Sequence, residues 1–192
     1  METWRLSLAS WVIQDGNYPD LRRGQRVEFA VEFHAPERLI PCRSAARTAR
    51  HEGGGWYSAE AVVVAATETA WVIDCGLLAY AEQPPPEGVR VGDAVKGRVL
   101  LGVDPFIYFE ELATQPDVPA LIYTWDLDRI QRETAPYVLD AAQRMYVRDE
   151  IRRGSAEIDA TDAWNDDDGH AEYLLECSRV DAAPRRTRTT TA

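Results

Sequence analysis

The chain has almost no lysine: of its 21 basic residues, Lys96 is the only one that is not arginine. The 32 acidic residues outnumber the basic ones, so the formal net charge is −11. A chain this acidic repels polyanions, because nucleic-acid affinity comes mainly from cations that neutralise phosphates. The charge balance therefore counts against nucleic acids and anionic membranes as partners. Arginine in place of lysine, with abundant alanine, also indicates a bacterium with a GC-rich genome.

Long apolar runs and a cysteine framework are also missing. No apolar stretch approaches the roughly 18 residues that a membrane-spanning helix needs, and the first residues resemble neither a signal peptide nor a transit peptide. The three cysteines, Cys42, Cys75 and Cys177, are odd in number and far apart, which favours reduced thiols. We therefore expect a soluble cytoplasmic protein in which Cys75 and Cys177 are buried in strands.

Motifs that carry catalysis or cofactor binding are absent as well. The sequence contains no Walker loop, no Gly-x-Gly-x-x-Gly and no nucleophile signature. The segment Asn165–Gly169 partly matches a calcium loop, but Trp164 and Leu175 would then occupy its first and last ligand positions. The sequence thus predicts no cofactor and no metal ion. It favours a non-catalytic protein over an enzyme built around His170 and the neighbouring aspartates.

What the sequence does contain is an alternation of apolar and polar residues with period two. In the run from 26 to 34, Val27, Phe29, Val31 and Phe33 fall on one face while glutamates occupy the other. This pattern predicts a half-buried strand with one wet face. Further strands are expected at 4–13, 56–66, 69–75, 91–101, 106–110 and 121–127. The strand at 56–66 is nearly all apolar, which predicts a central strand covered on both faces.

Short strands at this spacing, with turn signals between them, are typical of a barrel or sandwich. We expect a mainly β fold in which residues 1–135 form a small β-barrel or sandwich. The run Val91–Val99 resembles strands of OB-type barrels, so an OB-like barrel is one form that this core would take. An acidic β-hairpin extension over 136–181 is expected to pack on the core, followed by a disordered tail over 182–192.

Two features of that extension can be placed more closely. Its hairpin arms are expected at 157–163 and 171–180, joined by the acidic turn 164–170. The preceding stretch, 137–151, has apolar positions that fit a helix and others that fit a strand, so its structure stays open.

The last third of the chain concentrates negative charge: residues 136–182 hold 12 acidic and five basic side chains. Acidic faces attract and orient basic partners. Our leading hypothesis is therefore a non-catalytic interaction protein, of the immunity or adaptor type, that binds a basic protein partner. An acidity that only keeps the protein soluble is an equal alternative. The residues expected to bind the partner are Asp159, Asp162, Asp166, Asp167, Asp168, Glu172 and Glu176.

A loop rich in arginine supports a different function. The connection over residues 35–55 is long, and loops of this length are usually functional or mobile. The alternative hypothesis is an OB-like module that binds a nucleic acid or a small ligand through this loop. Aromatic residues would then stack on bases. Most of them, however, lie at the alternate strand positions that carry apolar side chains, which favours core packing. The arginines expected to contact such a ligand are Arg38, Arg43, Arg47 and Arg50.

Overall fold

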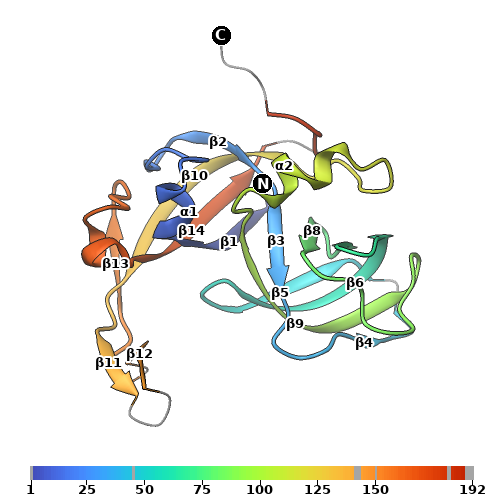
Figure 1. The fold of residues 1–192 in the computed structure, drawn as a ribbon, viewed down its shortest axis with the longest axis horizontal. Coiled ribbons are helices and arrows are strands. Elements are labelled where there is room, and N and C mark those ends of the chain that lie inside the picture. The colour runs from blue at the N-terminus through green and yellow to red at the C-terminus, as the bar shows by residue number, and fades with distance from the viewer. Residues whose placement is uncertain (1, 45, 141–143, 150, 181–182, 189–192) are drawn as a thin grey trace.

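The computed structural model describes residues 2–44, 46–140, 144–149, 151–180 and 183–188, and it is mainly β (Figure 1). No helix of this described chain is long and apolar enough to cross a membrane. In chain order the elements are β1 (Thr3–Ala9), α1 (Ser10–Gln14), β2 (Arg26–Phe29), β3 (Val31–His34), β4 (Ile40–Pro41), β5 (Thr48–Gly53), β6 (Trp56–Ala66), β7 (Trp71–Asp74), β8 (Leu78–Ala81), β9 (Ala94–Val103), α2 (Ile107–Glu110), η1 (Leu112–Thr114), β10 (Tyr123–Glu133), β11 (Tyr137–Asp140), β12 (Met145–Arg148), β13 (Ser155–Ile158), η2 (Asp166–Gly169) and β14 (Glu172–Arg179).

Five of these strands close into a barrel. β3 pairs with β9 and, in parallel, with β8; β7 and β6 follow, and β6 pairs back to β9. Full closure gives each of these strands a partner on both edges, which leaves few backbone groups without a hydrogen bond. β5 pairs with β6 and β4 pairs with β9 outside this ring. The prediction of a small barrel is confirmed.

A second group of strands extends the barrel. β14 lies between β1 and β10, and β2 and β13 pair with the opposite edge of β10, near its start and its end. The group joins the barrel where Ser7 of β1 pairs in parallel with Gly102 of β9. Figure 1 shows the two groups on either side of this junction, and a small separate sheet, β11–β12, standing away from them. We call this two-stranded sheet the arm.

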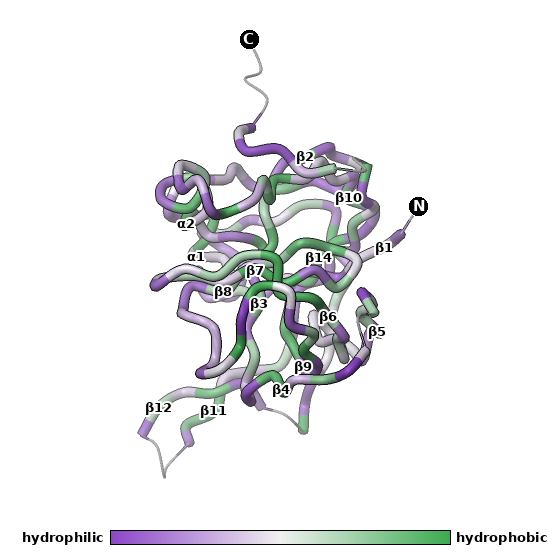
Figure 2. The backbone as a smooth tube through the Cα atoms, turned by 90° about the vertical axis from the view of Figure 1, so that its right-hand side faces the viewer, coloured by the Kyte–Doolittle hydropathy of each residue, from purple (hydrophilic) through white to green (hydrophobic). Residues whose placement is uncertain are grey.

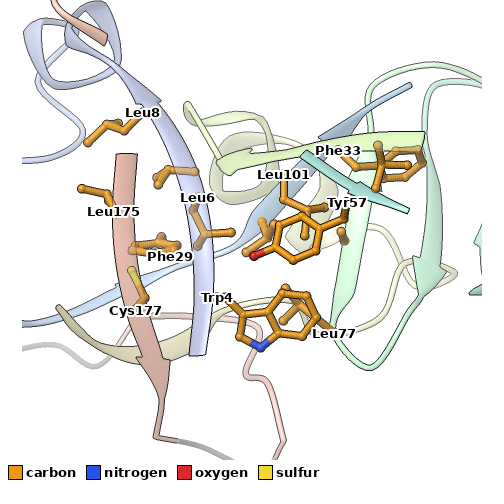
Figure 3. Close-up of a cluster of buried hydrophobic side chains, with 14 of the residues drawn as sticks. Trp4, Leu6, Leu8, Phe29, Phe33, Tyr57, Leu77, Leu101, Leu175 and Cys177 are labelled. Atoms are coloured by element: carbon orange, nitrogen blue, oxygen red, sulfur yellow. The ribbon is translucent and has the colours of Figure 1, made fainter. Parts of the chain in front are cut away.

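The core runs through both groups of strands. Trp71 meets Phe33 edge-on inside the barrel, with ring centres 5.1 Å apart, and Trp125 stacks on Phe29 at 5.3 Å beside β10. Trp4 lies among the side chains that join these two regions (Figure 3). Figure 2 shows the hydrophobic stretches of β3 and β9 in the middle of the molecule. Each fully buried aliphatic or aromatic side chain stabilises the fold by about 1.5–3 kcal/mol.

The alternation in the chain correctly predicts which side chains are buried. Phe29, Val31 and Phe33 are almost completely inaccessible and Val27 is partly buried, as predicted. The single strand expected over 26–34 is wrong, however: it divides at the buried Ala30 into β2, which pairs with β10, and β3, which belongs to the barrel. The strand over 56–66 also forms, but it is covered on one face only, since every second residue keeps some exposure. Of the stretch over 137–151, the described residues 137–140 and 145–148 form the two strands of the arm, so the strand alternative is the right one for them.

The expected hairpin between 157–163 and 171–180 is wrong. β13 and β14 do not pair with each other: β14 has β1 on one edge and β10 on the other, and β13 pairs with β10. An alternating strand satisfies more of its backbone groups between two long partners than in a hairpin with one free edge. The preference for a partner close in sequence fails here because residues far apart supply those longer partners.

Two shorter predictions are also wrong. The first strand ends at Ala9 and continues as helix α1. Residues 106–110 form helix α2 instead of a strand, because the buried carboxylate of Asp104 accepts a hydrogen bond from the Tyr108 N–H at 3.1 Å and turns the chain. Side chains that bond the first N–H groups of a helix stabilise its start.

The part of the C-terminal segment that the structure describes, residues 183–188, is not disordered as expected. Arg185 and Ile122 exchange two backbone hydrogen bonds, of 2.7 and 2.9 Å. The segment therefore adds a short bridge next to the start of β10. The rest of the predicted tail, residues 182 and 189–192, lies outside the described residues.

Candidate functional site

The acidic residues of the η2 turn are largely matched by arginines from other elements. Asp166 forms an ion pair with Arg132 of β10 and accepts a hydrogen bond from the Tyr173 hydroxyl at 2.9 Å. Its side chain is only 15% exposed. Asp167 lies 2.5 Å from a guanidinium nitrogen of Arg148, at the base of the arm. These two aspartates therefore hold the turn against β10 and the arm.

Two further acidic residues of the predicted set lie on other faces and are paired as well. Glu176, on β14, lies 3.1 Å from Arg5 of β1. Asp159 follows β13, lies 4.0 Å from Arg23 and leaves 95% of its side chain exposed. A pair this exposed contributes little to stability. The structure does not bring these two residues to the η2 turn.

The remaining three residues of the set differ from one another. Asp162 is exposed and accepts hydrogen bonds from the Asn165 amide at 2.9 and 3.0 Å. Asp168 is exposed and forms no ion pair within the described residues. Glu172 begins β14 and lies in the wall of a groove.

The arginines of the 38–50 segment do not converge on one surface. The segment includes β4 and most of β5, so it is not one open loop. Within the described chain, Arg43 is exposed and makes no ion pair. The partners of the other three are the Glu87 carbonyl for Arg38, Asp74 at 3.4 Å for Arg47 and Glu52 at 3.2 Å for Arg50. The prediction that this segment binds a ligand stays a prediction.

A hollow lies where the barrel meets the second group of strands. It has a volume of about 970 Å³ and opens to solvent. We call it the groove. On the barrel side its wall is the β5–β6 turn, on the far side it is the end of β10 with the starts of β13 and β14, and β1 lies between the two walls. The lining residues are Ser7, Glu52, Gly53, Gly54, Gly55, Trp56, Arg98, Leu100, Gln131, Glu133, Arg153, Gly154, Ser155, Glu172, Tyr173 and Leu174.

The barrel wall of the groove depends on the glycine run at the β5–β6 turn. Gly53 and Gly54 have φ angles of +134° and +53°, and such backbone conformations favour glycine. Gly55 is buried, and a Cβ there would collide with the hydroxyl of Ser7. The run thus lets the turn approach β1 closely, and this contact sets where the floor meets the wall.

The far wall carries two carboxylates. Glu133 is half-buried at the end of β10, and Glu172 lies at the start of β14. Partial desolvation raises the pKa of Glu172 to about 7, with Arg148 opposing the rise and Glu133 adding to it. Neither glutamate forms an ion pair within the described residues. The same wall also carries Arg153, so its two carboxylates outnumber its one arginine, and a cationic ligand would relieve the remaining cost.

The barrel wall offers an aromatic and basic surface. The Arg98 guanidinium lies over the Trp56 ring, 4.2 Å from its centre, a geometry in which the cation is attracted to the ring face. Its Nε lies 3.3 Å from the Glu52 carboxylate. The positive charge of Arg98 is thus already engaged, while the Trp56 ring supplies an apolar contact surface.

Comparison of the chain with protein-family models, with curated proteins and with solved structures gave no match in any of the three. The groove and its charges are therefore the basis of the functional argument. Among the described residues, no cluster of three or more histidine, cysteine and carboxylate side chains is arranged to hold a metal ion.

Sequence reasoning found Glu172 but missed the residues that share the groove with it. Glu52, Trp56, Arg98 and Glu133 belong to four different strands or their ends, and none of them stands in a motif. The one local signal for the groove is the glycine run before β6. The run is visible in the sequence, but its close approach to β1 is visible only in the structure.

Proposed function

We propose that this protein is a non-catalytic interaction module that binds a basic protein partner, and that a cationic segment of that partner lies in the groove. The observation that carries the proposal is the pair Glu133 and Glu172 on one wall of a 970 Å³ groove, where two carboxylates stand against the single arginine of that wall, Arg153. The overall charge of −11 supports it, because an acidic protein steers a basic one during encounter.

The free edges on both sides of the groove favour an extended segment. Within the described sheet, β5 has a partner on one edge only, and so has β13. Both strands contribute residues to the groove. A peptide that enters in an extended conformation can add backbone hydrogen bonds to such an edge, while its side chains enter alternate pockets.

The arm supplies a second contact surface next to the groove. It leaves β10 directly after Glu133, and its exposed apolar side chains include Leu139, Met145 and Tyr146. At its base Arg148 stacks on Tyr137 at 3.9 Å and donates to the His170 carbonyl at 3.0 Å. The arm is therefore fixed at its base, and the partner that fits this region is both basic and apolar.

The test uses a fluorescein-labelled peptide of alternating lysine and valine and measures its anisotropy with increasing protein. We expect the wild-type chain to bind it, and the Glu133→Gln/Glu172→Gln variant to bind at least about tenfold more weakly, because opposite charges attract across such a contact. A peptide of alternating glutamine and valine should bind neither protein.

A matched control separates the groove from overall charge. Glu68 and Glu87 are exposed and lie outside the groove, so the variant Glu68→Gln/Glu87→Gln makes the same change in net charge elsewhere. It should keep wild-type affinity for the lysine peptide. If both double variants weaken binding equally, the acidity acts only through the whole molecule and the groove is not the site.

A further inference from the structure

The C-terminal segment 183–188 is bound to the body of the protein mainly through its arginines. Arg185 lies 3.0 Å from Glu28 and donates a hydrogen bond to the Thr124 hydroxyl. Its backbone forms the bridge with Ile122 described above. The segment is thus fixed by a strand-like contact and by an ion pair whose Glu28 side chain is only 20% exposed.

Arg186 is recognised through backbone groups. Its guanidinium donates to three carbonyl oxygens of the loop that follows α2: Ala113 at 2.8 Å, Gln115 at 3.2 Å and Val118 at 2.6 Å. The planar guanidinium has five N–H donors in a fixed arrangement, so it can satisfy several converging acceptors at once. A lysine could not reproduce this set.

Arg188 completes the contact against two aromatic rings. Its guanidinium carbon lies 3.9 Å from the centre of the Phe109 ring and 4.4 Å from that of Tyr18, and Nη1 donates to the Asn17 carbonyl at 3.0 Å. Rings that meet a guanidinium in this way bind arginine by stacking and by cation–π attraction.

A buried carboxylate lies behind those rings. Asp104 is completely buried; one of its oxygens accepts hydrogen bonds from Tyr80 and Tyr108, and its carbonyl accepts from the Tyr18 hydroxyl at 2.8 Å. Its other carboxylate oxygen has no hydrogen-bond partner in the described chain, and neither do Nε and Nη2 of Arg188. Buried polar atoms without partners are costly in a purely structural contact, whereas a site with spare donors and acceptors suits an exchangeable ligand.

We propose that this face is a binding site for arginine-rich segments, and that the chain's own residues 183–188 occupy it in cis. We define the arginine cradle as Asn17, Tyr18, Glu28, Asp104, Phe109 and the loop 113–118. The recognised chemistry is three guanidinium groups within four positions of an extended segment. An arginine-rich segment with that spacing on another chain competes for the same cradle. The cradle shares no residue with the groove, so this inference does not rest on the proposed function.

The experiment compares the full chain with a variant whose own segment has lost its arginines, Arg185→Ala/Arg186→Ala/Arg188→Ala. The probe is a fluorescein-labelled synthetic peptide of residues 183–188, followed by anisotropy. In the wild-type protein the attached segment competes at an effective concentration in the millimolar range. We therefore expect the variant to bind the peptide at least about tenfold more tightly than the wild type does.

Two controls define the outcome. The same peptide with lysine at its three arginine positions should bind the variant at least about fivefold more weakly, since lysine cannot stack or donate in the planar arrangement. The variant Arg22→Ala/Arg43→Ala/Arg90→Ala removes equal charge from exposed positions elsewhere and should behave as the wild type does. Equal binding of the arginine and lysine peptides, or equal binding by the wild type and the first variant, would overturn the proposal.

The test does not depend on the triple variant being fully stable. If far-ultraviolet circular dichroism shows that its β structure is lost, Arg186→Ala alone opens the cradle while Arg185 keeps its bridge to Ile122. Arg186→Ala should still bind the peptide more tightly than the wild type does, by a smaller factor than the triple variant. As a further check, Tyr18→Leu is added to the triple variant, which removes one stacking ring. Its affinity for the peptide should be lower than that of the triple variant alone.

Discussion

The Arg98 guanidinium lies 4.2 Å from the centre of the Trp56 ring, and its Nε lies 3.3 Å from the Glu52 carboxylate. These contacts engage the cation on the barrel wall of the groove. Across the groove, Glu133 and Glu172 form no ion pair within the described residues, and Arg153 is the arginine that shares their wall. The two walls therefore differ in the charge that they offer a ligand, and this difference, more than the net charge, defines the kind of partner expected.

Replacing single aspartates of the η2 turn should separate structural charges from surface charges. Asp166→Asn breaks the ion pair with Arg132 and weakens the hydrogen bond from Tyr173. We expect it to lower the free energy of unfolding by about 1–3 kcal/mol, as measured by urea denaturation. Asp168→Asn changes an exposed side chain and should shift stability by less than about 0.5 kcal/mol. Equal effects would contradict the assigned roles.

Binding of the lysine peptide should depend on pH through Glu172. Its pKa is raised to about 7, so the carboxylate is mostly protonated below that value and mostly ionised above it. Affinity should therefore increase between about pH 6 and pH 8, and a bound cation should move the midpoint downward. In Glu172→Gln this increase should be absent. A pH profile that the substitution leaves unchanged would show that Glu172 does not face the ligand.

The partly buried Glu32 and the buried Asp104 should make the protein less stable as the pH rises. Burial raises the pKa of Glu32 from 4.5 to about 7 and that of Asp104 from 3.8 to about 6. The folded state then binds these protons more tightly than the unfolded chain. Their contribution to stability is complete below the unfolded pKa values and is lost as pH rises through the folded ones.

The substitution Glu32→Gln isolates this effect. We compare the free energy of unfolding of the variant minus that of wild type at two pH values. This difference should be roughly 2 kcal/mol larger at about pH 8 than at about pH 5, because wild type loses its Glu32 contribution between them and one pKa unit corresponds to about 1.4 kcal/mol. Urea denaturation at both pH values measures it. A difference that stays constant between the two pH values would mean that Glu32 is ionised without cost.

The three cysteines should differ in reactivity. Cys42 keeps some exposure, while Cys75 and Cys177 are buried, and burial raises the pKa of Cys75 to about 12 and that of Cys177 well above its ordinary value. A thiol reagent needs access and a thiolate. In the native protein we expect one fast reaction, at Cys42, and the other two only after unfolding, as followed by mass spectrometry. Rapid labelling of all three would contradict the packing of β14.

The sequence predicts local structure better than it predicts partners. Period-two alternation correctly identifies Phe29, Val31 and Phe33 as buried, because each side chain's direction follows from the strand backbone alone, but it does not show that the run divides into two strands at Ala30. Pairing is different. The alternation in β14 is compatible with pairing to any other strand of similar length, and its two actual partners come from residues far away in the chain. The hairpin expected from sequence proximity is wrong for this reason.

The site shows the same limit. The acidic segment was expected to be one surface, yet Asp166 and Asp167 meet Arg132 and Arg148, which the turn itself does not contain. Charge counted along the chain includes pairs that folding neutralises. Conversely, Glu133 gains its importance only because β10 and β14 lie side by side.

Reversing the charge of the groove wall tests the central claim most directly. We expect Glu133→Lys/Glu172→Lys to lose affinity for the lysine–valine peptide and to bind a glutamate–valine peptide that the wild type rejects, since like charges repel across an interface and opposite charges attract. The matched variant Glu68→Lys/Glu87→Lys should keep the wild-type preference. If the groove variant also keeps the wild-type preference, or if both variants change it equally, the groove does not bind the basic partner.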